Sequence, residues 1–298
     1  MIRSVKVVAN CHCLPLADAF ALCVPGVQTD FIDVNFAQTA DTLTKIAGLA
    51  GGEAEIVFTQ PMADHLGSLA TDALRHRLGT SSVVAFTNVH FSGLHPDITY
   101  LGGMGQRLQG FFGDYHSKLV LFSYISRRSL DDCLALFAGA TYERIGYLAA
   151  FDRSADELLA RDTALDVRFA AAFIAMARDA PTLYTINHPT GAVFLALAKA
   201  LANHAGLPFL HLDPALFQNH LATNYIWPVY DAIAEHNRLA FRMPLVFIQK
   251  SQRDSRAATL GEFVSGCYAA YAKAEFSQLQ AAVASMPFYM AFAEQLGV

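Results

Sequence analysis

The sequence predicts an α/β fold in which a mostly parallel sheet is flanked by helices, with a helical insertion and a helical C-terminal region. In the first half of the chain, short apolar runs rich in β-branched residues alternate with longer amphipathic stretches, the pattern of parallel strands joined by helical crossovers. Helical periodicity dominates residues 126–180 and again most of residues 215–298. No repeat or evident linker separates these parts, so we expect one domain over residues 1–298, with its core in residues 1–125 and 180–215.

Each expected strand is an apolar run that ends at a polar turn. These runs cover residues 5–9, 27–34, 55–59, 82–87, 182–186 and 207–212, and a shorter extended piece is expected at 244–249. Helices are expected over residues 37–50, 63–78, 106–125 and 192–204. The spacing of Ser129 with Asp132, and of Ser154 with Glu157, is that of a capping box and predicts a helix start at each serine.

The composition excludes several classes of protein. Hydrophobic residues make up 54% of the 298 residues and charged residues 16%, which excludes a disordered chain. The formal net charge of −5 argues against a nucleic-acid-binding protein, because such proteins carry an excess of basic residues. No signal-peptide core and no apolar run long enough to span a membrane is visible, so the mean hydropathy of +0.31 favours buried helices or a homo-oligomer interface and allows peripheral membrane contact.

The five cysteines do not form a disulfide framework, because their number is odd and their spacing irregular. The expected compartment is therefore the reducing cytoplasm. Cys13, Cys23, Cys133 and Cys267 are expected to be buried structural residues.

Polar side chains follow the expected strands, at the edge of an α/β sheet where ligands bind. Asn10, Cys11 and His12 follow the first run, and Gln60, Asn88 and His188 follow three later runs. Cys11 precedes a helix start, where unpaired N–H groups favour a thiolate, although a cysteine there can equally be a buried apolar residue. His188 is a candidate general base, and the amides of Gln60 and Asn88 are candidate oxyanion donors, although turn residues of these types are common in any fold.

Two further groups of residues bear on the kind of site. His116, Lys118, Arg127 and Arg128 form a basic cluster in a region poor in charge, which suits a phosphate-bearing ligand or is simply a solvated surface. A zinc site at Cys11, His12 and Cys13 is not expected, because the usual second ligand pair is missing.

Five motifs, "ANCHC", "FTQPMAD", "TNVHFSGLHPD", "DYHSK" and "NHPT", resemble in order those of the WcbI-type capsular polysaccharide biosynthesis proteins, a family of acetyltransferase character. The resemblance runs from residue 5 to about residue 200. The family pattern at the first turn is Gly-Asn-Cys-Gln, so Asn10 and Cys11 match whereas Ala9 and His12 depart from it. There is also a looser analogy to SGNH-type hydrolases, because Cys11, Asn88 and His188 occur in the same order as the serine, asparagine and histidine of those enzymes. On this analogy we expect a Rossmann- or SGNH-like core.

The resemblance implies a coenzyme A-binding O-acetyltransferase that moves acetyl from acetyl-CoA to a sugar hydroxyl of a polysaccharide or its precursor. Cys11, His188, Asn88 and Gln60 would be catalytic. Coenzyme A would be held by the residues of the first turn and the basic cluster: Asn10, His12, His116, Lys118, Arg127 and Arg128. Two alternatives stay open at this point, a thiol or ester hydrolase that uses the same residues on water, and a non-catalytic nucleotide- or sugar-binding protein.

Overall fold

The computed structural model describes residues 2–50, 52–103, 106–250 and 255–297. The chain divides into two compact units, each built from three segments. Unit 1 comprises Met1–His90, Glu157–Met176 and His188–His220, and unit 2 comprises Phe91–Asp156, Ala177–Asn187 and Leu221–Val298. The expectation of a single domain stays a prediction.

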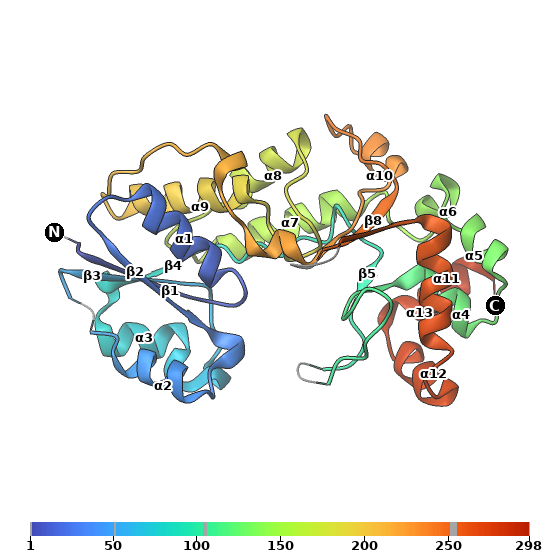
Figure 1. The fold of residues 1–298 in the computed structure, drawn as a ribbon, viewed down its shortest axis with the longest axis horizontal. Helices are drawn as coiled ribbons and strands as arrows, with labels where there is room; N and C mark the ends of the chain where they lie inside the picture. Colours follow the sequence, from blue (N-terminus) through green and yellow to red (C-terminus); the bar gives the residue numbers. More distant parts are fainter. Residues whose placement is uncertain (1, 51, 104–105, 251–254, 298) are drawn as a thin grey trace. The chain divides into compact units, whose positions relative to one another are not determined.

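Unit 1 contains the parallel sheet that the sequence predicts. Four strands, β1 (Ser4–Ala9), β2 (Gln28–Asp33), β3 (Glu55–Thr59) and β4 (Val83–Ala85), run parallel in the order β2-β1-β3-β4 (Figure 1). The first three match the expected runs within a residue or so. The fourth is shorter than expected, and the residue after it, Phe86, forms a parallel bridge with Val167.

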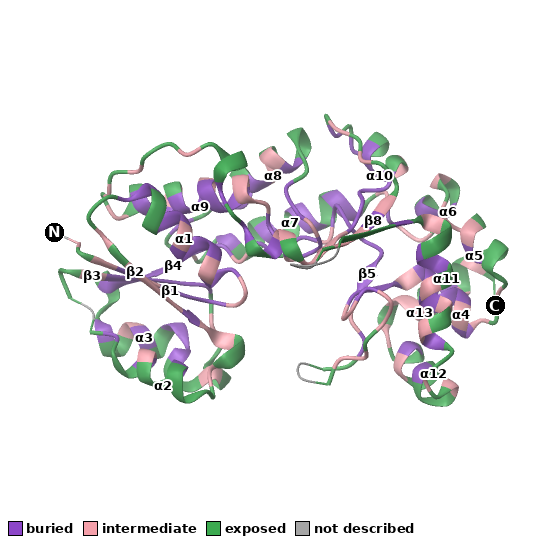
Figure 2. Cartoon of the chain, viewed as in Figure 1, coloured by how far each residue is buried: buried purple, intermediate pink, exposed green. Residues whose placement is uncertain are grey.

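Helices cover both faces of this sheet, with α1 (Cys13–Cys23) and α9 (Gly191–His204) on one face and α2 (Ala40–Ala47) and α3 (Thr71–Leu78) on the other (Figure 1). Successive residues of a strand point to opposite faces. Phe58 of β3 accordingly stacks on Phe20 of α1, with ring centroids 5.2 Å apart, whereas Val57 joins the buried cluster with Ile46 and Leu74. Figure 2 shows that the inner strands β1, β3 and β4 are largely buried, whereas the edge strand β2 is mostly of intermediate burial and the outer faces of α2 and α3 are exposed.

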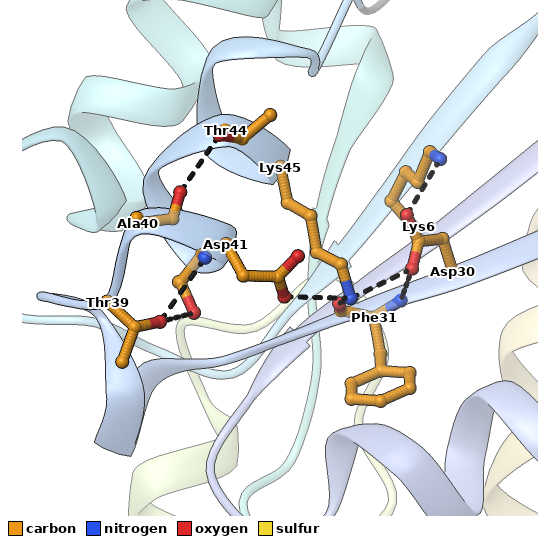
Figure 3. Close-up of polar contacts among 9 residues, drawn as sticks. Lys6, Asp30, Phe31, Thr39, Ala40, Asp41, Thr44 and Lys45 are labelled. Atoms are coloured by element: carbon orange, nitrogen blue, oxygen red, sulfur yellow. Dashed lines mark hydrogen bonds and ion pairs between the residues drawn. The ribbon is translucent and has the colours of Figure 1, made fainter.

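The edge strand β2 is joined to α2 by a small ionic cluster (Figure 3). Lys45 Nζ lies 3.6 Å from a carboxylate oxygen of Asp30 and 3.6 Å from one of Asp41, and 4.7 Å from the centre of the Phe31 ring. Thr39 is the N-cap of α2. These contacts tie α2 to β2, the edge strand of the sheet.

Unit 2 is mainly helical. Its helices are α4 (Lys118–Ile125), α5 (Leu130–Ala135), α6 (Gly139–Arg144), α10 (Asp231–His236), α11 (Leu260–Tyr271), α12 (Phe276–Ala284) and α13 (Pro287–Leu296). Two more, α7 (Ala150–Asp162) and α8 (Ala170–Asp179), run across the boundaries between the units. The helical character of the insertion and of the tail is confirmed, and no helix within the described residues is long and apolar enough to cross a membrane.

Unit 2 also holds two antiparallel sheets, of which the sequence predicts one strand. They are formed by β5 (Ile98–Thr99) with β6 (His116–Ser117), and by β7 (Tyr225–Ile226), β8 (Val246–Lys250) and β9 (Ser255–Thr259). The piece expected at residues 244–249 becomes β8. Its Phe247 stacks on Phe263 of α11, with ring centroids 3.9 Å apart, beside the fully buried Trp227.

Two expected strands are wrong. Residues 182–186 run through turns, and their backbone groups bond to separate segments, Ile186 O to Phe91 N and Tyr184 O to Trp227 N, each at 2.8 Å. Residues 207–212 also form no strand, and their Leu210 N donates to Cys23 O. An apolar run predicts burial, but a strand also needs a neighbour with which it can form a continuous ladder.

The helix predictions are wrong in three places. The helix expected over residues 106–125 starts only at Lys118, because residues 110–117 turn back and form β6. The one expected over residues 63–78 is broken at Gly67, whose φ of 59° is left-handed. Ser154 lies inside α7 and bonds to Ser92, so it caps no helix, whereas the capping box of Ser129 with Asp132 is confirmed.

Candidate active site

The carboxyl ends of three strands bring the predicted polar residues of unit 1 to one edge of the sheet. Asn10, Cys11 and His12 follow β1, and Gln60 follows β3 directly. Asn88 lies three residues beyond the end of β4. Because the strands are parallel and β1 pairs with β3, which pairs with β4, these residues meet, as the sequence predicts.

Gln60 connects the three strand ends. Its Oε1 accepts a hydrogen bond from Asn10 N at 3.2 Å, and its Nε2 lies 2.9 Å from His12 Nδ1 and donates to Asn88 Oδ1 at 3.2 Å. The residue is only 1% exposed. In this arrangement both hydrogens of Gln60 Nε2 are engaged, so Asn88 Nδ2 is the amide donor that the pair offers to a ligand.

The turn after β1 is held by Asn10. Its Oδ1 accepts from His12 N at 3.1 Å and lies 3.9 Å from Cys11 Sγ. His12 is the N-cap residue of α1 and is completely buried, with its ring edge-on to Phe194 of α9 at 5.6 Å. Since His12 Nδ1 faces the amide nitrogen of Gln60, the network assigns the imidazole proton to Nε2.

Cys11 is not the low-pKa thiol that its position predicts. Burial, with a smaller effect of the Asp33 carboxylate, raises its pKa to about 11, and Cys13 is raised further, to about 12. The proximity of a helix start does not offset this desolvation. Cys11 nevertheless differs from the other four cysteines, because it is partly exposed and they are buried.

His188 lies in the turn before α9, as predicted, although no strand precedes it. Its side chain is 6% exposed. Burial lowers its pKa to about 4, and the nearby imidazoles of His12 and His220 lower it further because two positive charges would repel each other. Its role as a general base stays a prediction, since a nitrogen of such low basicity takes up a proton weakly at neutral pH.

The remaining four candidates lie in unit 2, and all have structural partners there, Arg127 through its guanidinium, which lies 5.2 Å from the centre of the Phe276 ring. Both ring nitrogens of His116 are engaged, one 3.1 Å from Tyr271 Oη and the other 3.0 Å from a backbone oxygen. Lys118 Nζ donates to Pro96 O, and Arg128 Nη2 donates to two carbonyls at the end of α13. Arg127 is the exposed one, and a phosphate contact for any of the four stays a prediction.

Sequence reasoning missed three residues at this edge. Asp33 ends β2 opposite Ala9, and its charge acts on Cys11 and on His220. Asp18 lies on α1 and acts on His220 as well. Asp33 lies near the end of the strand expected over residues 27–34 and was therefore detectable, whereas nothing local in the sequence relates His220 to this turn.

The comparisons with known proteins show the family and the fold of this chain. Residues 4–210 match the family described as "Polysaccharide biosynthesis enzyme WcbI". A solved structure of WcbI, described as a novel polysaccharide biosynthesis enzyme in its native form without a disulfide bond between coenzyme A and a cysteine, is similar over 100% of both chains, with a TM-score of 0.75 and 14% sequence identity. No curated protein matches the sequence. The match over more than two thirds of the chain places this protein in the WcbI family of polysaccharide biosynthesis enzymes.

Proposed function

We propose that this protein is a coenzyme A-binding O-acetyltransferase that moves acetyl from acetyl-CoA to a sugar hydroxyl during polysaccharide biosynthesis. The carrying observation is the group of Cys11, His12, Gln60 and Asn88 at one sheet edge, in a chain that belongs to this family. A thiol, an imidazole and an amide donor are groups that acyl transfer from a thioester uses.

The description of the similar solved structure supports a position for coenzyme A beside Cys11. That structure is described as the form without a disulfide bond between coenzyme A and a cysteine. The description therefore refers to a cysteine whose thiol the sulfur of coenzyme A can reach. Among the cysteines of this chain, Cys11 is the partly exposed one and the other four are buried.

The raised pKa of Cys11 favours direct transfer over an acetyl-cysteine intermediate. With a pKa of about 11, only about one thiol in 10⁴ is ionised at pH 7. In the direct route, the acceptor oxygen attacks the thioester carbonyl, the carbonyl oxygen becomes an oxyanion that Asn88 stabilises, and the coenzyme A thiol leaves. Removing one oxyanion donor typically lowers kcat about 10²–10³-fold, so we expect a loss of that size for Asn88→Ala.

Calorimetric titration with coenzyme A and acetyl-CoA tests the binding half of the proposal. We expect binding by the wild type and weaker binding by Cys11→Trp, in which a bulky ring fills the space beside the thiol. Cys23→Ala is the matched control, since this cysteine is buried at the far end of α1. No heat and no thermal shift at millimolar coenzyme A would refute the proposal. Arg127→Ala in the same titration tests whether that cation contacts a phosphate.

Intact mass spectrometry and product analysis test the chemical half. Incubation with acetyl-CoA and no acceptor, followed by acid quench, should leave Cys11 unmodified, and Cys11→Ser should retain transfer to a saccharide acceptor. Release of free acetate at the same rate with and without acceptor would instead identify a hydrolase. An acetyl adduct on Cys11 that forms as fast as the overall reaction would establish the covalent route.

A further inference from the structure

Coenzyme A is an anion, because its adenosine end carries phosphates, and a cation beside the sheet edge of unit 1 would hold that end. The four residues that the sequence predicts for this role lie in unit 2, where each has a partner. Unit 1 contains eight lysines and arginines, and their contacts show which of them lies at the edge where Cys11 lies. They are Arg3, Lys6, Lys45, Arg75, Arg77, Arg161, Arg168 and Lys199.

Most of these cations are engaged elsewhere or lie away from the carboxyl ends of the strands. Three form ion pairs with aspartates, namely Lys6, Lys45 and Arg75. Two donate to carbonyls of α2 and of the segment after α7, namely Arg77 and Arg168. Arg3 precedes β1 and so lies at the opposite edge of the sheet. Lys199 lies about 12 Å along α9 from its first residue, since each helical residue rises 1.5 Å.

Arg161, near the end of α7, is bonded to the carboxyl edge of the sheet. Its Nη2 donates to His90 O at 2.7 Å, and His90 N donates to Asn88 O at 2.9 Å. Asn88 Oδ1 accepts from Gln60, which also bonds to the turn that carries Cys11. A series of hydrogen bonds therefore joins the guanidinium to the residues of the proposed site.

The guanidinium of Arg161 has donors left for an anion. An arginine side chain has five N–H groups, and among the described residues its contact with His90 O is the hydrogen bond that it makes. Its acidic neighbours, Glu157 and Asp162, form no ion pair with it in that part of the chain. Asp162 instead accepts two buried hydrogen bonds, each of 2.6 Å. Arg161 is exposed, so its Nε and Nη1 present the planar fork that binds phosphate.

The strand order places Arg161 at a distance from Cys11 that suits the two ends of coenzyme A. The segment after Arg161 pairs with the outer edge of β4, where Val167 N donates to Ala85 O at 3.1 Å. Since β3 lies between β1 and β4, the ends of these two strands are about 10 Å apart. The pantetheine arm separates the sulfur of coenzyme A from its phosphates, so it would run along this edge from Cys11 toward Arg161.

We propose that Arg161 is a further binding residue of this site, which contacts a phosphate of coenzyme A through Nε and Nη1 while its Nη2 stays on His90 O. The assignment rests on the proposed binding of coenzyme A. Arg161 holds the phosphate end, whereas Cys11 and Asn88 face the thioester. Because Arg161 does not touch the acetyl group, it determines the affinity for the donor and not the rate of the chemical step.

The experiment compares ligands that differ in their phosphates. Coenzyme A and dephospho-coenzyme A are titrated by calorimetry, and pantetheine, which has no phosphate, is followed by thermal shift at millimolar concentration. Arg161→Gln should weaken the binding of coenzyme A about 10–100-fold, the range for a lost hydrogen bond to a charged group, and leave pantetheine unchanged. Arg161→Lys, which keeps the charge but not the fork, should lose less. A smaller loss for dephospho-coenzyme A places the contact at the 3′-phosphate and an equal loss places it at the pyrophosphate, and both support the assignment.

Arg168→Gln is the matched control. Arg168 is an exposed arginine of the same unit, and its Nη2 also donates to a carbonyl at 2.7 Å, so this variant should bind coenzyme A like the wild type. Equal affinities of Arg161→Gln and Arg168→Gln, beside a wild type that binds, would overturn the assignment alone. So would a loss of the same factor for pantetheine, because Arg161 would then only hold the loop that carries Asn88. A wild type that binds no coenzyme A would overturn the proposed function, and this assignment with it.

Discussion

Replacement of Gln60 by leucine tests whether this one buried amide holds the site together. The substitution keeps a similar volume and removes all three hydrogen bonds, to Asn10, His12 and Asn88. His12 Nδ1 is left without its partner in a position that water does not reach, which costs about 1–3 kcal/mol. Asn10 and Asn88 are partly exposed, so water replaces part of each lost bond, and about 0.5–1.5 kcal/mol is the usual loss for a bond of this kind. We expect the free energy of unfolding to fall by about 2–4 kcal/mol.

Urea titration of the wild type and Gln60→Leu measures this loss, provided that the slope of the transition is the same for both proteins. Gln38→Leu is the matched control, because Gln38 is an exposed glutamine of the same unit, and we expect it to stay within about 0.5 kcal/mol of the wild type. Nitrogen-15 NMR of His12 provides a second measurement, since the wild type should carry its proton on Nε2. A loss below about 0.5 kcal/mol in Gln60→Leu, or a wild-type His12 protonated on Nδ1, would refute the reasoning.

Three further predictions concern other parts of the structure. Alkylation of Cys11 by iodoacetamide should precede that of the buried cysteines and accelerate about tenfold for each pH unit from 7 to 10, because its pKa is about 11; a rate that levels off near pH 8 would contradict this. Asp97→Ala should lower the free energy of unfolding by at least about 3 kcal/mol, since this buried carboxylate accepts from two tyrosine hydroxyls and from the first turn of α4, whereas the exposed Asp156→Ala should change it little. Lys45→Met should cost less than about 1 kcal/mol, because the ion pairs in Figure 3 are partly exposed and screened; a loss above about 2 kcal/mol would show that they hold α2 in place.

The sequence alone was sufficient for the sheet of unit 1 and for the convergence of its polar residues. Apolar β-branched runs at residues 5–9 and 55–59 are local signals, and alternation with helical stretches implies parallel strands. Parallel strands all end at the same edge, so Cys11, Gln60 and Asn88 were bound to meet once the strands were right. The same reasoning failed at residues 182–186, because the partners of their backbone groups lie far away in the chain.

Only the tertiary structure decided how these residues are joined and charged. Three features depend on groups distant in sequence: Gln60 at the end of β3 bonds to residues at two other strand ends, burial raises the pKa of Cys11, and Lys118 and Arg128 donate to backbone carbonyls. The placement of His220 beside His188 depends likewise on a packed segment that no local pattern marks. Periodicity reports which face of an element is buried, whereas hydrogen-bond partners and pKa values are set by whatever the fold brings within a few ångströms.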